Sequence, residues 1–212
     1  MIDVIIADDH PLFRKGLRSG LEEHPDIRVI AEAASGKEAL DLLTRQSCRV
    51  LILDISLPDI SGIEVLKTIM DRGDACHVLV LSTYPEKQYA VRCLKAGALA
   101  YITKDSPPAE LITAVRRVAE GRRYVSMDLA DQMASILSKE ESGLPHEQLS
   151  DREFEIFCLI GKGLAVTEIA SKLSLSPATV YTYRSRICFK TGLSTPAEIV
   201  RYVIERGITL VD

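Results

Sequence analysis

Several features are missing from this sequence of 212 residues, which has no tryptophan and no Cys-x-x-Cys pair. No apolar run approaches the roughly 20 residues of a membrane span. Residues 1–4 pass directly into a strand pattern and lack the layout of a signal peptide. The five cysteines are scattered, which favours buried thiols in a reducing compartment over disulfides or zinc ligands. We therefore expect a cytoplasmic protein without a membrane span.

A strong charge of one sign is also missing, since the formal net charge is −4. Residues 1–123 hold 17 basic and 18 acidic side chains, residues 124–148 hold 1 and 5, and residues 149–212 hold 8 and 7. These counts give −1, −4 and +1. Because the last segment is not a polycation, any DNA binding by it must depend on one local face.

Strand and helix patterns alternate through the first half of the chain. Continuous apolar runs at Val50–Leu53 and at residues 78–81 are typical of strands that are buried on both faces of a parallel sheet. Five such strand-helix units fit into about the first 120 residues, which predicts an α/β fold with a five-stranded parallel sheet. In the flavodoxin-like strand order 2-1-3-4-5, the first and third strands are neighbours.

Polar side chains stand where these strands end. Asp8 and Asp9 end the first strand, Asp54 the third and Ser82 the fourth, and Lys104 follows the fifth. Ligands of open α/β sheets bind at this edge. Clustered carboxylates repel one another unless a hard cation such as Mg²⁺ lies between them, and Lys104 and Ser82 would receive an anion. The pattern predicts phosphoryl transfer to Asp54, with Asp8 and Asp9 as metal ligands. Taken singly, each carboxylate could equally be an ordinary loop residue.

In the second half of the chain, the apolar residues follow a different spacing. Residues 122–148 are rich in charge, glycine and proline after a short amphipathic stretch, and they predict a linker with a short helix. From Leu149 onward the apolar spacing is helical throughout. Two short helices joined by a tight turn at residues 174–176 predict a helix-turn-helix. No acidic residue occurs from Ser176 to Thr195, and this suits a helix that enters a phosphate-lined groove.

Residues 1–120 resemble the receiver domain of bacterial two-component response regulators. The resemblance is carried by Asp8-Asp9, Asp54 with Pro58 and Gly62, Ser82, Tyr101 and Lys104. It implies that Asp54 is the phosphoacceptor and that Ser82, Tyr101 and Lys104 act as the switch. It also implies a Mg²⁺ site formed by Asp8, Asp9, Asp54 and the Ser56 backbone carbonyl. Ser56 and Tyr84 depart from the commonest family pattern, and both positions flank the phosphoryl site.

Residues 149–207 resemble the four-helix LuxR-type DNA-binding domain, and the two halves together resemble NarL/FixJ-type response regulators. The matching motifs include Ser150-Asp151-Arg152-Glu153, Glu168-Ile169-Ala170 and Arg184-Ser185-Arg186-Ile187. The resemblance implies that the second helix of the motif lies in the major groove. The implied DNA contacts are Thr167, Thr179, Tyr181, Thr182, Tyr183, Arg184, Ser185, Arg186 and Lys190, of which Tyr181 and Tyr183 replace the common Lys and His.

The expected domains are a receiver over residues 1–121, a linker over 122–148 and a DNA-binding domain over 149–212. The expected partners are a sensor histidine kinase, double-stranded promoter DNA, a second copy of the chain after phosphorylation, and RNA polymerase. No enzyme activity is expected beyond transfer of a phosphoryl group to Asp54 and its slow loss. Two alternatives stay open. A Mg²⁺-dependent phosphohydrolase is disfavoured because Asp54-Ile55-Ser56 lacks a second carboxylate, and a DNA binder that no longer uses phosphate would not need the Asp54 site.

Overall fold

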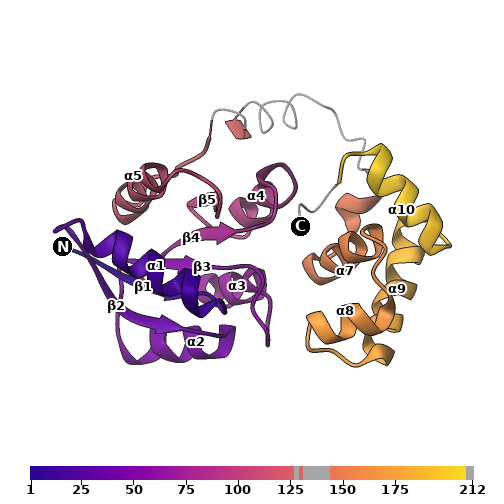
Figure 1. Cartoon of the computed structure of the whole chain (residues 1–212), viewed down its shortest axis with the longest axis horizontal. Helices are drawn as coiled ribbons and strands as arrows, with labels where there is room; N and C mark the ends of the chain where they lie inside the picture. Colours follow the sequence, from indigo (N-terminus) through magenta and orange to yellow (C-terminus); the bar gives the residue numbers. More distant parts are fainter. Residues whose placement is uncertain (127–128, 131–143, 209–212) are drawn as a thin grey trace. The chain divides into compact units, whose positions relative to one another are not determined.

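The computed structural model describes residues 1–126, 129–130 and 144–208 (Figure 1). The chain forms two compact units, Met1–Met133 and Ala134–Asp212. Among the described residues, no helix is long and apolar enough to cross a membrane.

The first unit is built on a five-stranded parallel sheet with the order β2-β1-β3-β4-β5, which Figure 1 shows from its lower to its upper edge. This confirms the predicted α/β class and strand order. The strands are β1 (Ile2–Ala7), β2 (Ile27–Ala33), β3 (Val50–Leu53), β4 (His77–Ser82) and β5 (Ala100–Thr103). All four residues of β3 are buried, as expected for a strand covered on both faces.

Five helices cover this sheet: α1 (Pro11–Glu22), α2 (Gly36–Arg45), α3 (Gly62–Arg72), α4 (Glu86–Lys95) and α5 (Pro108–Ala119). Alternate strand residues such as Val4, Ile52 and Leu79 form one core with Leu21 of α1 and Val115 of α5. The residues between them face the other side of the sheet and are buried as well. The carboxyl ends of the strands are left as the edge that carries polar side chains.

The chain leaves α5 along the open edge of β5. Tyr124 forms an isolated parallel bridge with Ala100, and its N–H donates to the Leu99 carbonyl at 2.9 Å. Ser126 Oγ donates to Glu86 Oε2 of α4 at 2.7 Å. These residues lie in the predicted linker, whose boundaries stay a prediction. Most of its predicted short helix falls outside the described residues.

The described part of the second unit, residues 144–208, is built from helices and contains the predicted helix-turn-helix. Its elements are the 3-10 helix η1 (Pro145–Gln148) and the helices α7 (Asp151–Gly161), α8 (Val166–Lys172), α9 (Pro177–Thr191) and α10 (Pro196–Glu205). Phe157, Ile169, Val180, Ile187 and Ile199 are fully buried and form the core between these helices. Ser150 Oγ and Glu153 form the predicted capping box at the start of α7.

The turn between α8 and α9 contains a strained residue, since Ser174 has a φ of 51°. In this left-handed region a side chain with a Cβ costs about 1 kcal/mol relative to glycine. We expect Ser174→Gly to raise the free energy of unfolding by about that amount, measured by urea unfolding of the full chain. The control Ser171→Gly, at an exposed position inside α8, should lower it by about 0.5 kcal/mol. A loss of stability with Ser174→Gly would contradict the assignment of strain to this turn.

Candidate functional site

Two buried carboxylates meet at the carboxyl edge of the sheet. Asp8 directly follows β1 and Asp54 directly follows β3, and the Asp54 N–H donates to the Ala7 carbonyl at 2.8 Å. Each residue is only 2% exposed. Asp8 Oδ1 accepts the His10 N–H at 2.8 Å, and Asp54 Oδ1 accepts the Ser56 N–H at 3.1 Å. Backbone donors therefore hold one oxygen of each carboxylate in place.

Lys104 lies between these two carboxylates. Its Nζ is 2.7 Å from Asp8 Oδ2 and 2.7 Å from Asp54 Oδ2, and its side chain is 9% exposed. The ring of Phe13 lies on the other side, with its centroid 4.6 Å from Nζ. Burial alone would lower the pKa of Lys104, but the charges of Asp54 and Asp8 raise it. Burial, with Asp8 adding to it, raises the pKa of Asp54 although Lys104 opposes the shift.

The carboxylates form a cluster that fits a divalent cation. One ligand atom from each of Asp8, Asp9, His10 and Asp54 lies within 4.8 Å of the others. Asp9 Oδ1 is buried and only 2.7 Å from His10 Nδ1, yet it accepts no well-aligned hydrogen bond from the described residues. The ammonium group of Lys104 contacts two of the three carboxylates, Asp8 and Asp54, so the cluster has an excess of negative charge. Sequence reasoning missed His10, because its imidazole joins the cluster only through the loop that follows Asp9.

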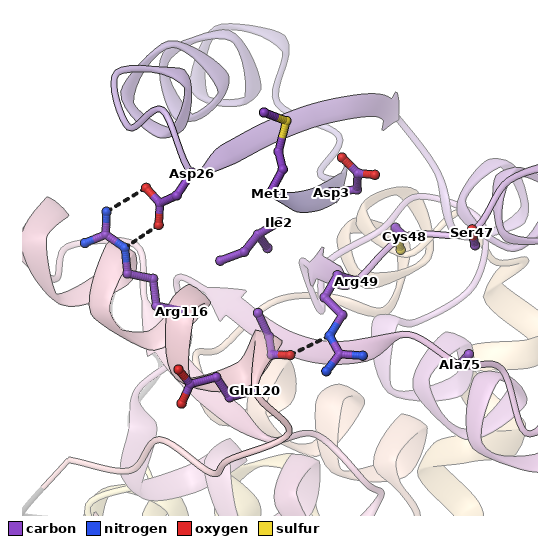
Figure 2. Close-up of a pocket in the computed structure, with 11 residues that line it drawn as sticks. Met1, Ile2, Asp3, Asp26, Ser47, Cys48, Arg49, Ala75, Arg116 and Glu120 are labelled. Carbon is purple, nitrogen blue, oxygen red and sulfur yellow. Dashed lines mark hydrogen bonds and ion pairs between the residues drawn. The ribbon is translucent and has the colours of Figure 1, made fainter.

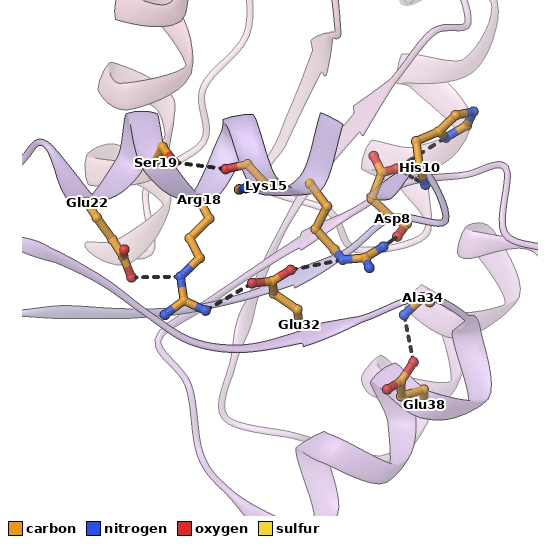
Figure 3. A network of polar contacts seen from close by, with 10 residues as sticks. Asp8, His10, Lys15, Arg18, Ser19, Glu22, Glu32, Ala34 and Glu38 are labelled. Carbon is orange, nitrogen blue, oxygen red and sulfur yellow. Dashed lines mark hydrogen bonds and ion pairs between the residues drawn. The ribbon is translucent and has the colours of Figure 1, made fainter. Parts of the chain in front are cut away.

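A chain of ion pairs between α1 and β2 supports the loop that contains Asp8 (Figure 3). Arg14 donates to the Asp8 carbonyl, and its Nε lies 3.0 Å from Glu32 Oε2. Arg18 lies 3.0 Å from Glu32 and 3.1 Å from Glu22. The guanidinium of Arg14 therefore ties the backbone of Asp8 to Glu32 of β2, a role that no local motif in the sequence indicates.

The loop after β3 is held by a glycine and an aspartate. The Gly62 N–H donates to the Ile55 carbonyl at 2.9 Å, and a Cβ on Gly62 would lie 2.1 Å from the Asp54 carbonyl oxygen. Only glycine fits there. Asp59 accepts the N–H groups of Gly36 and Lys37 at 2.8 and 3.0 Å and so caps α2. Burial opposes the shift, but these N–H groups hold the pKa of Asp59 below its usual range.

Ser82 and Tyr101 meet through the backbone of Tyr84. Ser82 Oγ accepts the Tyr84 N–H at 3.2 Å, and the Tyr101 hydroxyl donates to the Tyr84 carbonyl at 2.7 Å. Tyr101 is fully buried, and burial raises its pKa well above the ordinary value. The Tyr84 ring stacks on Tyr89 of α4 with centroids 4.6 Å apart. The structure thus brings the residues of the predicted switch together, while their switching role stays a prediction.

Most of the predicted DNA contacts lie on the outer face of α9, whose inner face buries Val180 and Ile187. The exposed members are Thr167 on α8 and Tyr181, Thr182, Ser185, Arg186 and Lys190 on α9, and the half-buried members are Thr179, Tyr183 and Arg184. Arg184 lies 5.6 Å from the Tyr181 ring centroid and Arg186 lies 5.9 Å from that of Tyr183.

Two features of α9 were not expected from the sequence. Phe189 is 90% exposed and lies four residues after Ser185, on the same outward stripe. Lys190 does not extend freely, because its Nζ lies 2.6 Å from Glu153 Oε2 of α7, a carboxylate whose side chain is 4% exposed. Burial opposes the shift, but Lys190 and the Ser150 N–H hold the pKa of Glu153 below its usual range. This pair fixes α9 to α7, and a Lys190 phosphate contact stays a prediction.

Both units match known families. Residues 4–116 match the family described as "Response regulator receiver domain", and residues 147–203 match "Bacterial regulatory proteins, luxR family". The chain is 35% identical over 209 residues to the response regulator UvrY of Escherichia coli K12, covering 98% of this chain and 96% of UvrY. It is 37% identical to the transcriptional regulatory protein UhpA of the same strain, covering 97% and 99%.

The same family is found among solved structures. RcsB of Salmonella enterica serovar Typhimurium, bound to promoter P1flhDC in the presence of the phosphomimetic BeF3−, is 25% identical with a TM-score of 0.68, and the match covers 96% of this chain and 98% of RcsB. A LuxR-family response regulator from Aurantimonas is 33% identical with a TM-score of 0.61, covering 66% and 99%. The chain belongs to the NarL/FixJ family of response regulators, the transcription regulators of two-component systems that join a receiver domain to a LuxR-type DNA-binding domain.

Proposed function

We propose that Asp54 accepts a phosphoryl group from a sensor histidine kinase and that this modification controls promoter binding by a homodimer. The observation that carries the proposal is the placement of Lys104, 2.7 Å from both buried carboxylates Asp8 and Asp54. A buried carboxylate next to a fixed cation is suited to attack an anionic phosphoryl group.

The transfer breaks the P–N bond of a phosphohistidine and forms a P–O bond to an Asp54 carboxylate oxygen. Lys104 neutralises charge on the transferring group, and Asp8, Asp9 and Asp54 with the Ser56 carbonyl are the proposed Mg²⁺ ligands. Bound Mg²⁺ supplies further neutralisation of the phosphoryl oxygens. Slow reaction of the aspartyl phosphate with water resets the switch, so the chain is its own substrate and turns over nothing else.

The change at Asp54 has a route to the connecting segment within the first unit. A phosphoryl group carries about −1.5 to −2 charges and competes for Lys104 and for the Ser82 hydroxyl. Ser82 binds the Tyr84 N–H, and Tyr84 in turn binds Tyr101 and stacks on Tyr89 of α4. Helix α4 also holds Ser126 through Glu86. This route allows the phosphoryl group to bias the surface of α4 and β5 between two arrangements.

In the DNA-binding half, α9 enters the major groove, where Tyr181, Thr182 and Ser185 read bases and the arginines hold phosphates. Two copies bind two half-sites with two-fold symmetry. Helix α10 carries Ile204, which is 65% exposed, and is the proposed contact between the DNA-binding halves. RNA polymerase is the further partner proposed at the promoter.

The proposal is tested on the full chain with acetyl phosphate and Mg²⁺. We expect the molar mass from light scattering to double, and DNA affinity to rise about tenfold, as is typical of coupling between two sites. The control omits Mg²⁺ by adding EDTA. Steady hydrolysis of a generic phosphomonoester over many turnovers would instead support the phosphohydrolase alternative.

Arg186→Ala should weaken DNA binding of every sequence alike, because we place this guanidinium on phosphates. A plot of log K against log salt concentration has a negative slope, and each lost phosphate contact makes this slope shallower by about one unit. The measurement is a salt titration of binding to operator and non-specific DNA. The matched control is Arg122→Ala, after α5 in the first unit, where the side chain is 70% exposed and lies 3.3 Å from Glu120. An unchanged slope for Arg186→Ala removes this residue from the interface.

A further inference from the structure

Two cysteines lie side by side at the amino ends of neighbouring strands, at the sheet edge opposite Asp54. Cys48 precedes β3 and Cys76 precedes β4, and the His77 N–H donates to the Arg49 carbonyl at 3.1 Å between them. Both cysteines are free and buried, with exposures of 7% and 6%. Each thiol shifts the pKa of the other, so the two side chains interact. The site described above uses neither of them.

Small molecules can reach this pair. A cavity of about 610 Å³ opens at this end of the sheet and is lined by Cys48, Arg49 and Ala75. Figure 2 shows Cys48 beside Ser47, near the Arg49 side chain that donates to the Ala119 carbonyl. A small oxidant therefore has a path to the Cys48 side of this pair without unfolding of the domain.

The directions of the pKa shifts agree with contact between the two thiols. The interaction with Cys48 lowers the pKa of Cys76, although burial opposes the shift. The interaction with Cys76, together with burial, raises the pKa of Cys48. A thiolate on one sulfur is stabilised by the proton that stays on the other, and this thiolate is the nucleophile.

We propose that Cys48 and Cys76 form a reversible disulfide when the protein meets a peroxide. The thiolate of one cysteine attacks one peroxide oxygen, the O–O bond breaks, and a sulfenic acid and one water form. The thiol of the other cysteine then attacks the oxidised sulfur, an S–S bond forms, and the sulfenic oxygen leaves as a second water. Two electrons pass from the thiols to the peroxide, and a dithiol reductant reverses the change.

The test treats the full chain with hydrogen peroxide, blocks the remaining thiols with iodoacetamide and digests with trypsin without reduction. Cleavage after Arg45, Arg49, Arg72 and Lys87 releases peptides 46–49 and 73–87. We expect these two peptides to be joined by a disulfide. The mass of the joined pair should be about 2 Da below the sum of the two peptides with free thiols, and dithiothreitol should separate them fully. The cross-linked chain should also unfold at a higher temperature than the reduced chain, since the bond restricts the unfolded state.

Controls separate this pair from general oxidation. Cys93→Ala removes a fully buried thiol elsewhere and should leave the joined peptides unchanged. Cys48→Ser and Cys76→Ser should each abolish them and leave the remaining cysteine as a sulfenic or sulfinic acid. Oxidation of the parent chain without joined peptides, or with Cys48 joined to another cysteine, overturns the proposal. The readout does not depend on phosphorylation of Asp54, so its failure is distinct from failure of the proposed function.

Discussion

Asp54→Asn is expected to abolish the increase in DNA affinity that acetyl phosphate and Mg²⁺ produce in the parent chain. An amide has no charged oxygen to attack phosphorus, so no aspartyl phosphate forms. The substitution keeps the shape of the side chain, and the amide oxygen still accepts from Lys104 or from the Ser56 N–H. The expected result is therefore a folded chain that binds operator DNA with the affinity of the unmodified parent, measured by fluorescence anisotropy with and without phosphodonor.

The matched control is Asp105→Asn, which makes the same change at an exposed carboxylate one residue after Lys104. It should respond to phosphodonor as the parent does. If Asp54→Asn dimerised and gained DNA affinity to the same extent as the parent, the phosphate switch would be wrong. The alternative of a DNA binder that does not use its receiver half for phosphate would then hold.

Lys104→Met should destabilise the receiver by about 3 kcal/mol at neutral pH in EDTA, because removal of one partner leaves buried charges without compensation. Asp8 and Asp54 would then face each other at 2% exposure with no cation between them. Added Mg²⁺ should restore part of the loss, since a ligand that binds only the folded state stabilises it. The measurement is the free energy of urea unfolding in EDTA and in Mg²⁺.

A double variant supplies the control for this prediction. Lys104→Met combined with Asp54→Asn removes one negative charge along with the ammonium, so it should be more stable in EDTA than Lys104→Met alone. Its gain from Mg²⁺ should also be smaller. Equal stability of the two variants in EDTA would show that the uncompensated charge of Asp54 is not the cause of the loss in Lys104→Met.

The sheet and the centre of the site could be predicted from the sequence because both follow from local patterns and one topological rule. An apolar run that ends in Asp8 or Asp54 identifies a strand and its carboxyl end. Parallel strands place these ends at one edge, and the flavodoxin-like order makes the first and third strands neighbours. The helix-turn-helix was equally accessible, since Ser150 and Ser176 cap helices in the structure as their spacing predicts.

The supporting contacts could not be predicted, since they join residues that are far apart in the sequence. Asp59 caps α2, although its own position reads as a turn. Lys190 belongs to an acid-free span that favoured phosphate contact, but it lies three residues after the buried Ile187 and reaches Glu153 on α7. Helical spacing alone assigns such a flanking residue to neither face. The exposure of Phe189 could not be predicted for another reason, because a phenylalanine in a helix is usually buried.

The bridge between Tyr124 and Ala100 has a consequence for solubility. Strand β5 is the last strand of the sheet, and an uncovered edge strand offers unpaired N–H and C=O groups to a strand from another copy. Tyr124 occupies part of this edge by taking the Leu99 carbonyl, and the hydrogen bond of Ser126 to Glu86 keeps the segment in place. A fragment that ends at Gly121 leaves this edge open to pairing between copies. The start of the connecting segment thus protects the receiver from aggregation.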